Sequence, residues 1–95
     1  MRLKDRVAII TGASTGLGLS MAEVFSEEGA SVVINYPDES EEENATNLAA
    51  KIKESGGRAI IVQADVSDWE QVGLLTDVTL QTFGTIDILI NNAGV

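Results

Sequence analysis

The chain lacks cysteine and histidine altogether among its 95 residues. A zinc site, a Cys or Ser–His nucleophile and a disulfide framework are therefore excluded. Basic residues are also scarce, since six Lys and Arg stand against fifteen Asp and Glu and leave a net charge of −9. Nucleic acid is an improbable partner for such a chain, because binding to a phosphate backbone depends on clusters of Lys and Arg.

Long hydrophobic runs are missing as well. The longest, such as Val7–Ile10 and Val32–Ile34, fall far short of the ~20 apolar residues that cross a bilayer. The first six residues do not lead into the apolar region of a signal peptide. We therefore expect no membrane contact and a cytoplasmic location. What the chain does have is 44% hydrophobic residues, enough to build the core of one domain.

Short apolar runs alternate with longer helical patterns, an order typical of βαβ units in a parallel sheet. Continuous apolarity suits strands covered by helices on both faces, and predicts strands over Val7–Thr11, Ser31–Asn35, Ala59–Ala64 and Ile86–Asn91. Right-handed crossovers with one reversal of direction give the strand order 3-2-1-4. The fold class expected is therefore α/β, a Rossmann-type doubly wound parallel sheet with a ligand crevice between strands one and four.

Three helices are expected between these strands, over about Gly16–Glu28, over about Glu41–Ser55, and from an N-cap at Ser67 to about Phe83. Ser67 and Glu70 form the pattern of a capping box, in which each side chain satisfies a backbone N–H at the start of a helix. The acidic run Glu39–Glu43 is interpreted as a solvated helix start rather than as a metal site.

A glycine-rich loop, Thr11–Gly18, joins the first strand to the first helix. Gly12 permits a tight turn, Gly16 close approach of a pyrophosphate, and Gly18 close packing of helix on strand. Backbone N–H groups at the helix start then form an anion site that suits a diphosphate. No Gly-Lys-Ser/Thr follows, which disfavours a mononucleotide hydrolase. A turn without any ligand remains the alternative for the loop taken alone.

Two further motifs follow later strands: Asp65-Val66 after the third and Asn91–Gly94 after the fourth. Together with the glycine loop, and in this order, they resemble the short-chain dehydrogenases/reductases along all 95 residues. Within that family, Val33–Tyr36 and Gly56–Gln63 look most like bacterial glucose 1-dehydrogenases and next like 3-oxoacyl-carrier-protein reductases.

The resemblance implies a nicotinamide dinucleotide, NAD or NADP, as cofactor and an alcohol or carbonyl compound as substrate of a full-length enzyme. It implies contacts of the phosphates with Ser14, Thr15, Gly16 and Leu17, of adenine with Asp65 and Val66, and of the ribose nearest nicotinamide with Asn92, Ala93 and Gly94. A carboxylate can accept from the adenine amine, and a backbone N–H can donate to a ring nitrogen. Thr11 and Asn91 are expected to be scaffold residues.

The choice between NAD and NADP depends on charge beside the second strand, because an acid there favours NAD and a basic residue favours NADP. The expected end of that strand, Asn35, is neutral and is taken as a cofactor-site residue. Thr15 stands where NADP-preferring relatives often carry a basic residue, and Asp38 follows Pro37, which places it in a turn. The sequence therefore predicts dual use, or NAD with modest preference.

Family catalysis needs a Ser and a Tyr-x-x-x-Lys pair, and this chain has neither arrangement. Its one tyrosine is Tyr36, and Ser40 stands four residues later. We therefore expect residues 1–95 to be the N-terminal, cofactor-binding part of a longer, homotetrameric enzyme, and to be inactive alone. Two alternatives remain: a non-catalytic nucleotide-binding or regulatory module, and a methyltransferase-type domain for S-adenosylmethionine, whose usual acid after the second strand is absent.

Overall fold

The computed structural model of the chain describes residues 2–92. Its elements follow in the order β1 (Val7–Ile10), α1 (Gly16–Glu27), β2 (Ser31–Tyr36), the 3-10 turn η1 (Glu39–Glu41), α2 (Glu42–Glu54), β3 (Arg58–Gln63), α3 (Trp69–Phe83) and β4 (Ile88–Ile90). All neighbouring strands are parallel, and their order in the sheet is β3-β2-β1-β4. The predicted α/β class and the strand order 3-2-1-4 are therefore confirmed.

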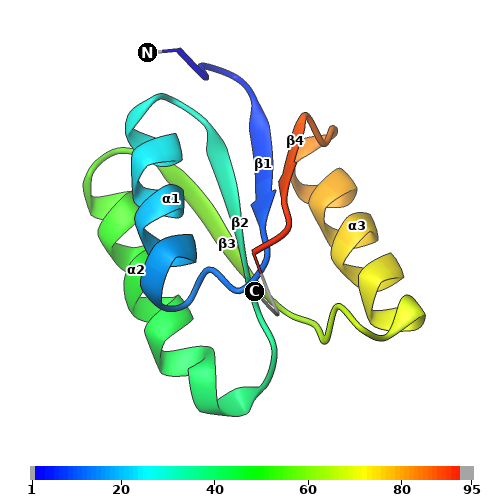
Figure 1. Cartoon of the computed structure of the whole chain (residues 1–95). Helices are drawn as coiled ribbons and strands as arrows, with labels where there is room; N and C mark the ends of the chain where they lie inside the picture. The colour runs from blue at the N-terminus through cyan, green and yellow to red at the C-terminus, as the bar shows by residue number, and fades with distance from the viewer. Residues whose placement is uncertain (1, 93–95) are drawn as a thin grey trace.

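Helices cover both faces of the sheet, with α1 and α2 on one side and α3 on the other (Figure 1). Ile10 and Ile34 point into the layer shared with α1 and α2, whereas Ile9 and Val33 pack toward α3. Every residue of β1 and β2 is buried. This two-sided burial explains why these strands are continuously apolar rather than alternating.

Strand ends differ from the predicted ones by one or two residues. β2 extends to Tyr36, because that residue pairs with Gln63 and its carbonyl accepts from the N–H of Ala64 at 3.0 Å. β4 is shorter than predicted and begins at Ile88. Asp87, just before it, contacts β1 twice: its carboxylate accepts from the N–H of Val7 at 2.9 Å, and its own N–H donates to the Val7 carbonyl at 2.9 Å.

The predicted N-cap of the third helix is wrong by one residue. Asp68 is the N-cap, and its Oδ1 accepts from the N–H of Glu70 at 2.9 Å. Ser67 is not free for that role, because its hydroxyl donates to Asp65 Oδ1 at 2.7 Å. Short polar side chains compete for nearby backbone and side-chain partners, so a capping pattern alone does not fix which one caps.

The second helix begins at Glu42, one residue later than predicted, because η1 precedes it. Asp38 caps that turn: its Oδ1 accepts from the N–H of Ser40 at 2.9 Å and also from the Ser40 hydroxyl. Asp38 thus lies in the turn, as predicted from its place after Pro37.

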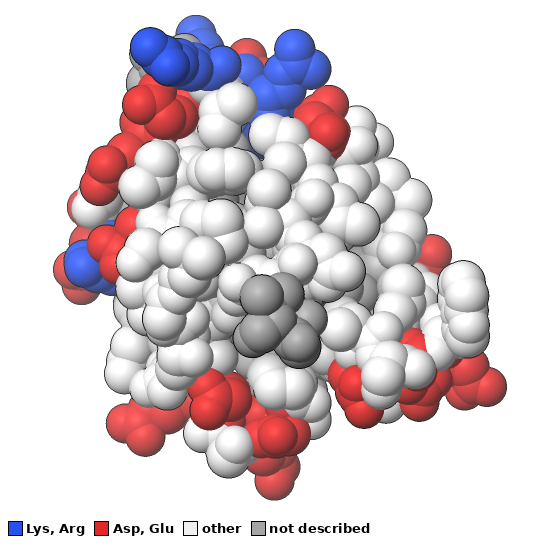
Figure 2. All heavy atoms as spheres, viewed as in Figure 1, with Lys and Arg blue, Asp and Glu red and all other residues white. Residues whose placement is uncertain are grey.

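Lys and Arg gather at one end of the sheet, with acidic side chains among them, whereas the other end carries mainly acidic side chains (Figure 2). Basic side chains lie where strands begin, at Arg2, Lys4 and Arg6 before β1 and at Arg58 in β3. Acidic side chains follow the carboxyl ends of β2 and β3, at positions 38, 39 and 41–43 and at 65, 68 and 70. Because the strands are parallel, the carboxyl end of the sheet is the acidic one.

No helix within residues 2–92 is long and apolar enough to cross a membrane. Over the same residues, no group of three or more acidic side chains is arranged to hold a metal ion.

Candidate functional site

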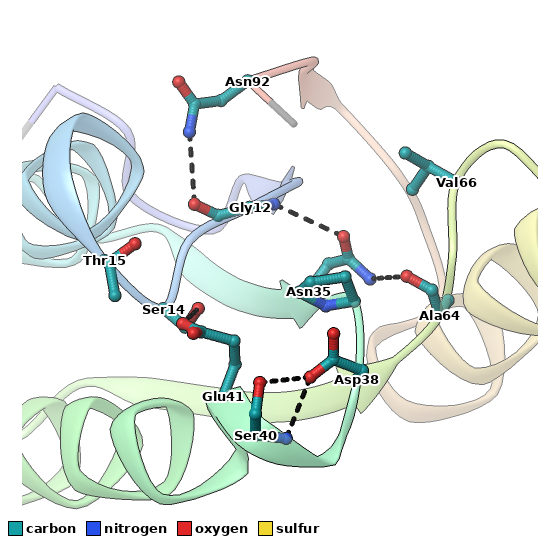
Figure 3. Close-up of a pocket in the computed structure, with 11 residues that line it drawn as sticks. Gly12, Ser14, Thr15, Asn35, Asp38, Ser40, Glu41, Ala64, Val66 and Asn92 are labelled. Atoms are coloured by element: carbon teal, nitrogen blue, oxygen red, sulfur yellow. Dashed lines mark hydrogen bonds between the residues drawn. The ribbon is translucent and has the colours of Figure 1, made fainter. Parts of the chain in front are cut away.

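A cavity of about 350 Å³ opens at the carboxyl ends of β1, β2 and β3 (Figure 3). It is lined by Gly12, Ser14, Thr15, Asn35, Pro37, Asp38, Ser40, Glu41, Ala64, Val66 and Asn92. We call it the cleft. Its residues come from the glycine loop, from the segment after β2, from the segment after β3 and from the end of the chain that the structure describes.

The glycine loop adopts backbone geometry that glycine alone takes easily. Gly12 and Gly16 have φ of 61° and 59°, in the left-handed region. A Cβ on Gly18 would meet the carbonyl oxygen of Gly12 and, at 2.7 Å, Asn92 Nδ2. A Cβ on Gly16 would meet nothing within 4 Å. Gly18 therefore lets α1 pack on the loop, and Gly16 leaves open space in front of the helix.

Asn35 is buried and holds three parts of the site together. Its Oδ1 accepts from the N–H of Gly12 at 3.4 Å. Its Nδ2 donates to the carbonyls of Val62 at 3.2 Å and Ala64 at 3.1 Å. The side chain thus ties the glycine loop and the end of β3 to β2, and its amide groups are engaged with the backbone. The strand itself ends one residue later, at Tyr36.

The end of β4 is tied to the glycine loop by Thr11 and Asn92. The Asn92 N–H donates to Thr11 Oγ1 at 2.9 Å, and Asn92 Nδ2 donates to the Gly12 carbonyl at 3.1 Å. Thr11 Oγ1 also lies 3.3 Å from Asn91 Oδ1. These contacts agree with the scaffold roles expected of Thr11 and Asn91, and they bring Asn92 into the cleft.

One hydrogen bond in the cleft involves an acidic side chain, and the sequence did not predict this contact. Glu41 Oε1 accepts from the hydroxyl of Ser14 at 2.8 Å, and Ser14 is only 3% exposed. The next residue, Glu42, accepts from the hydroxyl of Tyr36 at 2.9 Å. The acidic run forms the start of α2, with Glu42 exposed, as interpreted; the two hydrogen bonds are additional to that role. The available signal was that carboxyl ends of parallel strands share one edge of the sheet.

Two side chains beside the cleft have pKa values that are shifted from their ordinary ones. Hydrogen bonds from the Ser67 hydroxyl and the Ser67 N–H lower the pKa of Asp65, so its exposed carboxyl is firmly ionised. Burial, followed by the hydrogen bond to Glu42, raises the pKa of Tyr36, which therefore stays protonated. Tyr36 is thus a neutral donor that fixes Glu42 next to the acidic turn.

The predicted site residues fall into three groups. Those that line the cleft are Gly12, Ser14, Thr15, Asn35, Val66 and Asn92. Those beside it are Gly16, Leu17 and Gly18 on α1 and Asp65 before α3. Ala93 and Gly94 lie outside the described residues. Leu17 is 68% exposed, and the Asp65 carboxylate is turned to Ser67. The structure therefore brings most of the predicted residues to one end of the sheet, though not all into one cavity.

A second cavity, of about 490 Å³, adjoins the cleft on the side of α3. Its lining is mainly apolar and includes Ile9, Leu75, Ile86 and Leu89. Val66 lines both cavities. This second cavity lies beside β1 and β4, where the predicted crevice was placed.

Comparison with known proteins identifies the class to which this architecture belongs. A family model described as short chain dehydrogenase matches residues 6–95. The chain therefore belongs to the short-chain dehydrogenase family, as the three motifs indicated. Membership excludes the methyltransferase-type alternative.

Relatives of known sequence share almost the whole chain. A 3beta-hydroxysteroid dehydrogenase 1 of Eggerthella lenta is 47% identical over 93 residues, which are 98% of this chain and 35% of that protein. Glucose 1-dehydrogenase 2 of Bacillus subtilis is 42% identical over 92 residues, 97% of this chain and 35% of that protein. The chain thus spans about a third of the length of these curated relatives.

Solved structures agree with the fold along the full chain. A blue fluorescent protein from a metagenomic library, in complex with NADPH, superposes with a TM-score of 0.95 at 33% identity and covers 100% of this chain and 38% of its own. A short chain dehydrogenase of Burkholderia cenocepacia, in complex with NADP, gives a TM-score of 0.92 at 39% identity with the same coverage.

Proposed function

We propose that this chain is the NAD(P)-binding region of an oxidoreductase that transfers hydride between a nicotinamide cofactor and an alcohol, a sugar hydroxyl or a ketone. The observation that carries the proposal is the cleft, which opens at the carboxyl ends of three parallel strands in front of a glycine loop and a helix start. Doubly wound sheets bind dinucleotides at this position. Nicotinamide, when bound, supplies the hydride chemistry.

The start of α1 is the proposed position of the diphosphate. Thr15 is the N-cap, and its side chain makes no capping hydrogen bond. The N–H groups of the first turn are therefore left to a ligand, and the first turn carries no acidic residue that would repel an anion. Gly16 leaves open space there. Ser14 and Leu17 flank this helix start, where the family resemblance puts the phosphates.

The two ends of the dinucleotide would be held on either side of the loop. Val66 lines the cleft after β3 and is the proposed neighbour of adenine, with the ionised Asp65 beside it as acceptor. Asn92 lies beyond the loop on the β4 side and is the proposed neighbour of the ribose nearest nicotinamide. Ala93 and Gly94 follow it in the chain, and their assignment rests on the family resemblance.

Proton transfer to the substrate would come from another part of a longer enzyme, since these 95 residues hold no Tyr-x-x-x-Lys. We therefore propose that the chain alone binds cofactor without turnover. Relatives named for a sugar and for a hydroxysteroid support a hydroxyl-bearing substrate class. The cytoplasmic location and the homotetramer stay predictions.

Cofactor choice remains as the sequence predicted it, dual use or NAD with modest preference. The two solved structures named above hold NADPH and NADP. The residues that line the cleft here include Asp38 and Glu41 and no Lys or Arg. This lining supports NAD, because a carboxylate accepts from a ribose hydroxyl and repels a phosphate.

The proposed function is tested by calorimetric titration of the purified chain with NADH, using a matched pair of glycine variants. Gly16 and Gly56 both have positive φ, and a Cβ on either would meet nothing within 4 Å. Gly16→Ala and Gly56→Ala should therefore cost similar backbone strain, about 1 kcal/mol. We expect NADH binding to weaken about tenfold only in Gly16→Ala, since its added methyl group occupies the space for the phosphates.

Equal NADH affinities in the two variants would contradict the proposed position of the phosphates at the start of α1. A folded wild-type chain that binds neither NADH nor NADPH would contradict the proposed function itself, and circular dichroism of the same samples shows whether the chain is folded.

A further inference from the structure

Gln71 is the third residue of α3, and its side chain reaches back toward the end of β3. Its Oε1 accepts from the N–H of Asp65 at 2.7 Å, and its Nε2 donates to Asp68 Oδ2 at 3.1 Å. In a capping box the side chain at this helix position accepts from the N–H of the N-cap residue. Here the N–H of the N-cap, Asp68, donates to the Asp65 carbonyl at 3.0 Å instead. The Gln71 amide therefore holds the segment that follows β3 rather than the N-cap.

Asp65 is fixed through both of its backbone polar groups. Its N–H donates to Gln71, and its carbonyl accepts from the N-cap of α3. Ala64, just before it, is still tied to the sheet, because its N–H donates to the carbonyl of Tyr36 at 3.0 Å. The helix itself rests on the sheet through its buried residue Leu75. The chain between β3 and α3 is thus attached to the sheet at one end and to the helix at the other.

A neutral side chain suits position 71, because its neighbours are acidic. Asp65, Asp68 and Glu70 lie within this short segment, and the Ser67 hydrogen bonds keep Asp65 ionised. The amide of Gln71 accepts from one backbone N–H and donates to one carboxylate at the same time. A glutamate could only accept, and it would add a negative charge beside Asp68.

Val66 directly follows the residue that Gln71 holds, and it lines the cleft (Figure 3). Within residues 2–92, no group accepts from the Val66 N–H. A backbone donor at this place can bind a ring nitrogen of a base. Its position depends on the peptide groups of Asp65, which Gln71 and the helix start orient.

We propose that Gln71 is the positioning residue of the adenine side of the cleft: by holding the Asp65 N–H, it keeps Asp65 and Val66 in place to receive the base. The inference rests on the proposed function, since it concerns one end of the same dinucleotide. A segment that is already ordered does not have to be ordered when the ligand binds, which improves affinity without a new contact. Because Gln71 is only half-buried, its loss should affect binding more than folding.

The experiment compares Gln71→Met with a matched control on the same helix. Gln71→Met keeps the length of the side chain and removes both hydrogen bonds. Gln81→Met makes the same change at an exposed position of α3 that does not line the cleft. The probes for calorimetry on the full chain are NADH, ADP, which carries the adenine, and reduced nicotinamide mononucleotide, which does not.

We expect Gln71→Met to weaken NADH and ADP about fivefold to tenfold, since the segment must then be ordered by the ligand. The mononucleotide should change less than about twofold, and Gln81→Met should leave all three affinities within about twofold. A merely structural role would lower the affinities for ADP and the mononucleotide together, so the ratio of the two separates positioning from general damage.

A second measurement needs no cofactor. Amide hydrogen exchange followed by NMR should show the Asp65 N–H exchanging about tenfold faster in Gln71→Met than in the wild type, because local opening of the segment becomes easier. Gln81→Met should leave that rate unchanged. An equal rate in Gln71→Met and the wild type would overturn the role of this hydrogen bond. Circular dichroism of the same samples shows that the compared proteins are folded.

The outcomes distinguish the positioning role from the proposed function. If the wild type binds NADH and Gln71→Met weakens ADP and the mononucleotide by the same factor, or behaves like Gln81→Met, the positioning role is wrong and the proposed function stands. If the folded wild type binds neither NADH nor NADPH, both are wrong.

Discussion

Two helices, α1 and α2, cover one face of the sheet, whereas α3 alone covers the other (Figure 1). We call β1 and β2 with α1 and α2 the closed half, and the edge strand β4 with α3 the open half. On the closed side, Val32 and Ile34 are fully buried. On the open side, Leu89 of β4 is 62% exposed and Leu74 of α3 is 60% exposed. The same chain therefore contains a fully buried core beside an apolar surface that is exposed to water.

The difference teaches where the site obtains its rigidity. The glycine loop, Asn35 and Glu41 all belong to the closed half, where buried or partly buried hydrogen bonds hold them. The open half contributes Asn92 and the second, apolar cavity beside Leu89. An edge strand with exposed apolar side chains is a ready template for pairing with another strand. The contacts proposed for the cofactor phosphates therefore lie on the half whose strands are fully buried.

The largest expected effect comes from breaking the closed half. Ile34→Ala removes a fully buried side chain and should lower the free energy of unfolding by about 2–5 kcal/mol, because the surrounding strands cannot collapse into the cavity. Leu89→Ala on the open half is the matched control, and we expect a loss below about 1 kcal/mol there. Urea denaturation followed by circular dichroism measures both; similar losses would contradict the contrast between the halves.

A smaller effect is expected at Asn35, where the closed half meets the site. Asn35→Asp keeps the shape but cannot, when ionised, donate to the carbonyls of Val62 and Ala64. We expect a loss of about 2–3 kcal/mol at neutral pH. The deficit should shrink in acid, because a protonated Asp regains one donor. Urea titrations at two pH values measure it, and a deficit independent of pH would show that the lost donations are not its cause.

The smallest effect concerns Tyr36 in alkaline solution. Its raised pKa means that the folded chain keeps the phenolic proton after the unfolded chain has begun to lose it, above the ordinary value of 10.0. Stability is therefore full below that value and falls as pH rises through the raised one. Tyr36→Phe loses the hydrogen bond to Glu42, worth about 1 kcal/mol, but should show a shallower alkaline decline in melting temperature. Parallel declines would refute the shift.

The sequence predicted the architecture well because the architecture depends on local pattern. Continuous apolar strands, helix periodicity and the handedness of crossovers together fixed the order 3-2-1-4. The glycine loop was predicted from residue type, because glycine permits the tight turn between strand and helix, whereas Val66 was expected from the family resemblance. Ser67 was predicted as the N-cap of the third helix, a role that Asp68 takes in the structure. Three polar side chains compete within four residues, and a sequence pattern does not decide such competition.

Glu41 escaped prediction for a different reason. Its partner, Ser14, is 27 residues away, and nothing in the local sequence distinguishes it from its acidic neighbours. Only the convergence of strand ends, with the extra turn of η1, brings the two residues together. Contacts of this kind depend on loop conformation, which periodicity does not encode.

The separation of charge between the two ends of the sheet also makes the electrostatic field around the molecule differ from one end to the other (Figure 2). A negatively charged dinucleotide that binds at the glycine loop, as proposed, would approach the acidic end, so long-range forces would slow the encounter instead of steering it. Mobile ions screen such forces beyond about 8–10 Å. Under the proposed function, short-range contacts at the glycine loop would therefore govern cofactor binding, and added salt would speed the approach to this site instead of hindering it.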